Sequence, residues 1–185
     1  MALDFAEMAN SLRSLGAASP TPAARDQVRL ALASKFEGIQ AVAAEALGAW
    51  GDDDSVRALH DWLDELLTRP DSMAPRSVAI RELAPHGAKL DADRVLDRYF
   101  EVGKSVRPSV QLIQHELLSL VTALPEDAIR QRVLAAGSDS DARMRRAGLL
   151  VIVRSRFSDR EQLVRRFLAD SDDVVRKIAR LHAAA

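Results

Sequence analysis

Apolar residues recur along this chain at the three- and four-residue intervals of an α-helix, with polar residues between them. The first clear example forms one helical stripe of six residues: Ile39, Val42, Ala43, Ala46, Leu47 and Trp50. Gly51 follows at a position that suits a helix C-cap, and the aspartates at 52–54 can cap the next helix. That helix carries its own apolar stripe and should stop before Pro70. The pattern predicts two helices joined by a tight turn, and no stretch alternates long enough to predict a β-strand.

This helix pair is repeated along the chain. Equivalent segments begin near residues 39, 75, 110, 144 and 175, at steps of 36, 35, 34 and 31 residues. Helices are therefore expected at 75–86, 91–102, 109–123, 126–137, 142–156, 159–169 and 173–184, with two more before the repeats, at 3–15 and 23–35. Helical repeats of this length are typical of solenoids, in which each unit buries its apolar face against its neighbours.

The period predicts the architecture of the chain. We expect an all-α fold, an α-solenoid (superhelix) of about five to six stacked antiparallel helix pairs, forming a single domain over residues 1–185. Residues 1–36 would form N-terminal capping helices and residues 37–185 the repeats. Aromatic residues make up only 4% of the chain within an apolar fraction of 48%. Leucine, alanine and valine should therefore supply the core.

Three segments resemble a known repeat motif. Ala-Asp-Ser-Asp-Asp-Val-Val-Arg-Lys-Ile-Ala at 169–179 resembles the aspartate, valine-arginine, alanine motif of HEAT repeats, and 137–147 repeats it. Ala-Ala-Glu-Ala-Leu-Gly at 43–48 is similar to the Ala-Ala-x-Ala-Leu-Gly core of the same family. The resemblance implies a HEAT-like, armadillo-like superhelix, although Pro75 and Ser109 depart from the motif in the middle units. Tetratricopeptide repeats have a similar length, but their small packing positions would fall on His60 and Leu67, so HEAT-like repeats are favoured.

No cluster of catalytic residues is recognisable. His115-Glu116 could begin a zinc-binding His-Glu-x-x-His helix, but residue 119 is serine. The HEAT-fold iron-dependent hydroxylases also carry His-Glu pairs, but they repeat the pair, which occurs once here. The other histidines fall in different repeats: His60, His86 and His182. His60 lies beside Asp61 and Asp64, and we expect it to be a solvated surface side chain. We predict no enzymatic activity, no metal site and no cofactor.

The aspartate-rich turns at 52–54 and 170–173 lack the glycine and terminal glutamate of a calcium loop. We therefore expect Asp141 and Asp173 to cap helices rather than bind metal. The chain has no cysteine, which excludes disulfides, thiol catalysis and cysteine-ligated zinc. Its start lacks a secretory signal, and no stretch approaches the roughly 20 apolar residues of a membrane helix, so a cytoplasmic protein without a membrane segment is expected.

Three aromatic residues lie on expected second helices, which line the concave side of this kind of repeat: Trp62, Tyr99 and Phe100. They could stack on a base or anchor a peptide. Each also lies close to the apolar stripe of its own helix, so core packing is favoured.

Charge is unevenly distributed along the chain, although the net charge is only -1. Residues 1–140 carry 15 basic and 21 acidic side chains, a net charge of -6, whereas residues 141–185 carry 11 basic and 6 acidic, a net charge of +5. Arginine dominates this basic end, and arginine favours bidentate pairing with carboxylates or phosphates. Two interpretations remain open: the arginines form ladders with the aspartate caps, or they bind an acidic surface or a nucleic-acid backbone.

The last expected helix, 173–184, lacks a partner helix after it. Its apolar residues wrap more than one face, so it should bury itself against another protein or a second copy of this chain. The basic residues around it form the predicted partner-binding set: Arg165, Arg166, Arg176, Lys177 and Arg180. They favour an acidic partner, such as the acidic N-terminal half of a second copy.

The function expected from these features is a non-enzymatic protein-interaction scaffold or adaptor that uses the concave face and the C-terminal end. One alternative is a nucleic-acid-binding protein that resembles the HEAT-like DNA glycosylases. Nucleic-acid binding is less favoured for two reasons. The net charge of the chain is near zero, and the second helices mix Arg94 and Arg98 with nearby aspartates. A second alternative is a lyase subunit like the HEAT-like bilin lyases, which act with a partner chain.

Overall fold

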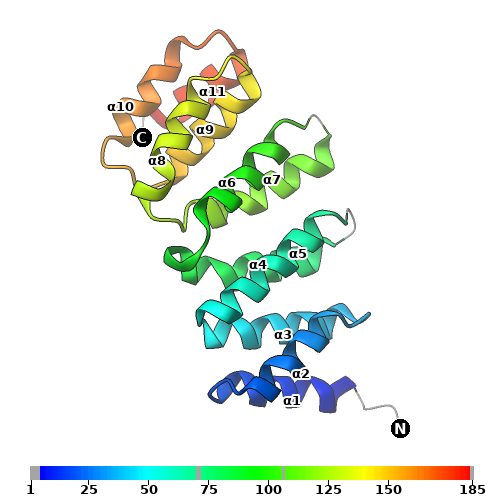
Figure 1. The fold of residues 1–185 in the computed structure, drawn as a ribbon. Coiled ribbons are helices and arrows are strands. Elements are labelled where there is room, and N and C mark those ends of the chain that lie inside the picture. The colour runs from blue at the N-terminus through cyan, green and yellow to red at the C-terminus, as the bar shows by residue number, and fades with distance from the viewer. Residues whose placement is uncertain (1–4, 70–71, 106, 184–185) are drawn as a thin grey trace. The chain divides into compact units, whose positions relative to one another are not determined.

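The structure is a computed structural model that describes residues 5–69, 72–105 and 107–183. These residues form eleven α-helices and two short 3-10 helices, and no β-strand (Figure 1). Along the chain the elements are α1 (Phe5–Ala17), α2 (Pro22–Leu32), α3 (Glu37–Trp50), α4 (Asp53–Leu67), α5 (Met73–Leu83), η1 (Ala84–Lys89), α6 (Ala92–Gly103), α7 (Pro108–Val121), α8 (Glu126–Gly137), α9 (Ala142–Arg154), α10 (Arg160–Arg165), η2 (Arg166–Ala169) and α11 (Asp173–Ala183). The prediction of an all-α fold is confirmed. Pro70 and the side chain of Ser109, on which two expectations fell, lie outside the described part.

The chain divides into two compact units, Met1–Leu90 and Asp91–Ala185. The prediction of a single domain over residues 1–185 stays a prediction. In the sequence register, α3, α5, α7, α9 and α11 are the first helices of the five repeats, and α4, α6, α8 and α10 are the second helices.

In the first unit, α3 is the central helix and packs on α1, α2, α4 and α5. Its stripe of small and branched residues, including Ala43, Ala46 and Leu47, is buried. Close approach is visible at Gly16 of α1, where an added Cβ would lie 2.9 Å from the Cα of Ala46. Gly51 ends α3 with a φ of 57°, the left-handed conformation that glycine adopts without steric cost.

In the second unit, α9 has the same central role and packs on α6, α7, α8, α10 and α11. An added Cβ at Gly148 would lie 2.8 Å from the backbone nitrogen of Gly137 in α8, so only glycine fits this crossing. Tyr99 of α6 is fully buried, and its hydroxyl donates to the carbonyl of Ala147 in α9 at 3.1 Å. This burial raises the pKa of Tyr99.

The repeat register read from the sequence places five equivalent residues in the core. The fifth residue of each unit is buried in every case: Ala43, Ala79, Gln114, Gly148 and Ala179. Four of the five are alanine or glycine, because helices that stack closely leave room only for small side chains there. The core placement of Trp62, Tyr99 and Phe100 is likewise confirmed.

His60 is buried, so the expectation that it lies on the surface is wrong. The reason is that α4 packs on both α3 and α5, which buries a wider face than the stripe of Val56, Leu59 and Leu63 alone. Among the described residues, no helix combines the length and apolar character required to cross a membrane.

Candidate functional site

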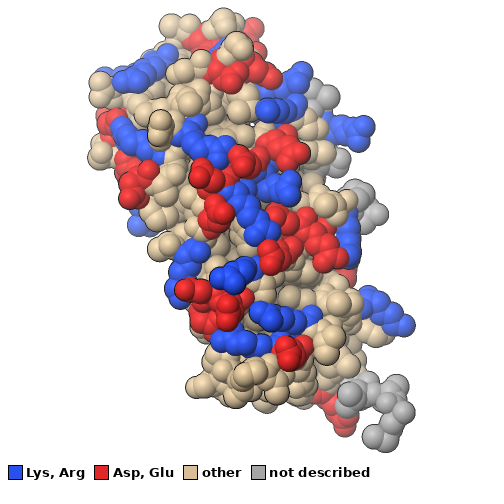
Figure 2. All heavy atoms as spheres, in the orientation of Figure 1, with Lys and Arg blue, Asp and Glu red and all other residues tan. Residues whose placement is uncertain are grey.

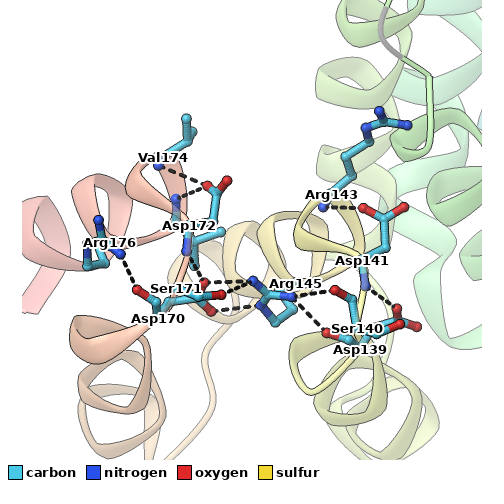
Figure 3. A network of polar contacts seen from close by, with 11 residues as sticks. Asp139, Ser140, Asp141, Arg143, Arg145, Asp170, Ser171, Asp172, Val174 and Arg176 are labelled. Carbon is cyan, nitrogen blue, oxygen red and sulfur yellow. Dashed lines mark hydrogen bonds and ion pairs between the residues drawn. The ribbon is translucent and has the colours of Figure 1, made fainter.

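Arg145 of α9 is the centre of a polar network that joins two turns (Figure 3), and its main partner, Asp170, lies 25 residues further along the chain. Its Nε and Nη2 atoms each donate to one carboxylate oxygen of Asp170, both at 2.8 Å. Nη1 donates to the carbonyls of Asp139 and Ser140 at 3.0 and 2.9 Å. The side chains of Arg145 and Asp170 are only 13% and 7% exposed, so this bidentate pair is largely shielded from water. The network ties the turn before α9 to the turn before α11.

The first unit contains a similar pair. Arg25 of α2 donates from Nη1 and Nη2 to the two carboxylate oxygens of Asp52 at 2.9 and 2.8 Å. Asp52 also accepts from the backbone nitrogen of Ser55 at 3.0 Å, which caps α4. The hydrogen bonds from Arg25 and Arg145 lower the pKa of Asp52 and of Asp170 below the usual range, despite partial desolvation.

Further ion pairs link neighbouring helices of the second unit. Arg130 of α8 lies 2.5 Å from Asp159, which precedes α10, and Arg132 of α8 lies 2.5 Å from Asp97 of α6. Several arginines of the basic end and of the preceding repeat therefore form ladders with acidic residues. The ladder interpretation holds for this part of the arginine set.

The aspartate turns act as helix caps. Asp141 accepts from the backbone nitrogen of Arg143 at 2.9 Å, as expected. The expectation for Asp173 is wrong, because Asp172 caps α11 by accepting from Val174 and Val175 at 2.9 and 3.0 Å. Asp173 begins the helix and pairs with Arg176 instead. Among the described residues, no three histidine or acidic side chains come together as a possible metal site.

Two of the five predicted partner-binding residues form ion pairs within the described part of the chain, and the other three do not. Arg176 is half-buried, donates to the carbonyl of Asp170 and pairs with Asp173, so it belongs to the network of Figure 3. Arg165 is exposed and pairs along its own helix with Glu161 at 2.5 Å. The other three are exposed and form no ion pair with any residue in the described ranges: Arg166, Lys177 and Arg180.

Exposed apolar side chains accompany these cations. On α11, Val174 and Leu181 are 50% and 66% exposed, whereas Val175 and Ala179 are buried. The spacing of Val174, Lys177 and Leu181 places them on one side of the helix. Leu168 of η2, which packs against α11, is also exposed, and the sequence reasoning missed it. We call this set the C-terminal surface: Arg165, Arg166, Leu168, Val174, Lys177, Arg180 and Leu181.

The sequence matches no protein-family model and no curated protein. Among solved structures, it is similar to an archaeal HEAT-like repeats protein from Thermococcus onnurineus NA1, with 13% identity, a TM-score of 0.52, and coverage of 97% of this chain and 78% of that one. The fold is that of a HEAT-like α-solenoid. The chain is also similar to a designed armadillo repeat protein, with 12% identity, a TM-score of 0.45, and coverage of 99% of this chain and 94% of that one.

Two surface grooves lie beside the second helices α4, α6 and α8. One, of about 530 Å³, lies between α2 and α4, with Trp62 among its lining residues. The other, of about 320 Å³, lies between α6 and α8, with Phe100 among its lining residues. Both grooves are lined by side chains of both charge signs, and Figure 2 shows the same interspersion of acidic and basic residues over the face it draws. Neither groove has the uniformly basic lining that binding of a nucleic-acid backbone requires.

Proposed function

We propose that this HEAT-like solenoid is a non-enzymatic protein-interaction scaffold that binds its partner through the C-terminal surface. One observation carries the proposal. Arg166, Lys177 and Arg180 are exposed without an ion pair to any described residue, and they accompany the exposed side chains of Leu168 and Leu181. Many other arginines of the second unit pair with carboxylates, as Arg145 does with Asp170.

The chemistry of this surface supports a protein partner with acidic side chains. Protein interfaces combine a desolvated apolar centre with a polar rim, and Leu168, Val174 and Leu181 supply such a centre. Cations at the rim steer an oppositely charged partner and set its orientation. Nucleic-acid interfaces are more polar and more strongly basic than this surface. We also propose that the protein acts in the cytoplasm.

A charge reversal tests the proposal. The double variant Lys177→Glu/Arg180→Glu should lose the proteins that the wild-type chain captures from cells that express it. The matched control is Arg57→Glu/Arg154→Glu, which makes the same change in charge at exposed positions of α4 and α9. Both variants should melt close to wild type, because exposed charges contribute little to stability.

Equal capture by the reversed and control variants would contradict the proposal. The nucleic-acid alternative has a separate measurement, the shift of a labelled duplex at low salt. We expect no shift. A shift that is lost in Lys177→Glu/Arg180→Glu and at high salt would favour nucleic-acid binding instead.

A further inference from the structure

A second surface of the first unit is open and apolar. Nine residues of α1, α2, the segment after α2 and the start of α3 line a groove of about 500 Å³: Glu7, Met8, Ser11, Leu12, Gln27, Leu30, Ala31, Ser34 and Ile39. Leu30, on its α2 side, is 76% exposed. Among the described residues that line the groove, Glu7 is the only charged one and none is basic. We call this feature the α1–α2 groove.

The first unit also exposes two aromatic side chains. Phe5 of α1 and Phe36, which precedes α3, pack edge to face with their ring centroids 6.4 Å apart. Phe36 lies in sequence between Ser34 and Ile39, which both line the groove. The first unit therefore exposes the aromatic pair Phe5 and Phe36 in addition to Leu30, which lines the α1–α2 groove.

Exposed large apolar residues are concentrated at two places in the described part of the chain. Three of the eight lie within residues 5–36, where Leu30 lines the α1–α2 groove and Phe5 packs on Phe36. Three others belong to the C-terminal surface: Leu168, Val174 and Leu181. The other two are separate, Met73 on α5 and Leu112 on α7. Two apolar surfaces on one chain can cover each other when two copies meet.

The two units also carry opposite net charges. Residues 1–90 contain nine basic and 13 acidic side chains, a net charge of -4. Residues 91–185 contain 17 basic and 14 acidic side chains, a net charge of +3. The same complementarity holds locally, because Glu7 lines the groove and the C-terminal surface carries Arg166, Lys177 and Arg180 without ion-pair partners among the described residues. Like surfaces of two copies would repel each other, whereas unlike surfaces attract.

We infer that the C-terminal surface of one copy docks on the α1–α2 groove of a second copy. Amphipathic helix α11 enters the groove with Val174 and Leu181, and Lys177, which lies on the same side of the helix, faces Glu7. This contact is head-to-tail, so each pair of copies keeps one free groove and one free C-terminal surface. The inference rests on the proposed function, because it names the partner of the same C-terminal surface.

Sedimentation velocity with single-surface variants tests the inference. The wild-type chain should form dimers and larger species as its concentration rises at low salt, and added salt should weaken them. Leu30→Glu, which blocks only the groove, and Leu181→Glu, which blocks only the C-terminal surface, should each be monomeric alone. An equal mixture of the two should form a dimer and nothing larger, because one intact groove meets one intact C-terminal surface.

Leu112→Glu is the matched control, since Leu112 is 60% exposed but lies on α7, outside both surfaces. It should assemble as the wild type does, and melting curves should show that all three variants fold. A wild-type chain that stays monomeric at high concentration and low salt would overturn the inference. So would a Leu30→Glu variant that still assembles, which would mean that two C-terminal surfaces pair with each other. If either result came with capture of a foreign protein that depends on Lys177 and Arg180, the proposed function would stand while the inference fails.

Discussion

Replacing Leu47 by aspartate should lower the free energy of unfolding by at least about 4 kcal/mol, the largest loss expected for a single change in the first unit. The Leu47 side chain is 1% exposed on α3, the helix that packs on α1, α2, α4 and α5. An aspartate there loses the packing of a buried leucine and also desolvates a carboxylate. Chemical denaturation followed by circular dichroism measures the loss.

Leu112→Asp provides the control for this change, because it introduces the same charge at an exposed position of α7. Its unfolding free energy should stay within about 1 kcal/mol of wild type. A comparable small effect for Leu47→Asp would contradict the placement of α3 at the centre of the first unit.

Replacing Asp170 by asparagine should cost about 3 kcal/mol at neutral pH, because it leaves the largely buried guanidinium of Arg145 without its carboxylate. Arg145 lowers the pKa of Asp170 in the folded state, so the unfolded state binds the proton more tightly. The stabilisation is therefore fully present above the unfolded pKa of about 3.9 and is lost as the pH falls through and below that value.

The difference between wild type and Asp170→Asn should accordingly shrink when denaturation is repeated below about pH 4. Glu161→Gln is the control, since its ion pair with Arg165 is exposed on both sides and should contribute at most about 1 kcal/mol. A loss for Asp170→Asn no larger than that of Glu161→Gln would show that the network of Figure 3 does not stabilise the second unit.

Helix positions could be predicted closely from the sequence because they follow from local physics. The 3.6-residue period of residues such as Ile39, Val42 and Leu47 marks the buried side of α3, and Gly51 and Asp52 mark the turn after it. The expected helix at 126–137 matches α8, and the expected segment 159–169 matches α10 together with η2. Spacing also identified the repeat, because stacked helices require small residues at equivalent places, as at Ala79 and Ala179.

Features that depend on how helices meet could not be predicted in this way. His60 is polar, and only the packing of α4 on both of its neighbours buries it. Asp172 and Asp173 are identical in type, and the backbone path into α11 decides which one caps the helix. Arg145 and Asp170 are 25 residues apart in the chain, and they pair only because the turns before α9 and α11 come together in the fold. The sequence therefore could not distinguish the arginines that form ion pairs from those that do not. The α1–α2 groove is formed between two helices and has no motif.

Site-specific photo-crosslinking in cells that express the chain tests the central claim most directly. A benzophenone amino acid placed at Arg180 lies on the C-terminal surface, and one placed at Arg57 on α4 serves as the control. We expect protein adducts at position 180 that are absent at position 57, whether the captured chain is a second copy or another protein. Adducts with nucleic acid at position 180, or the same adducts at both positions, would contradict a protein-binding C-terminal surface.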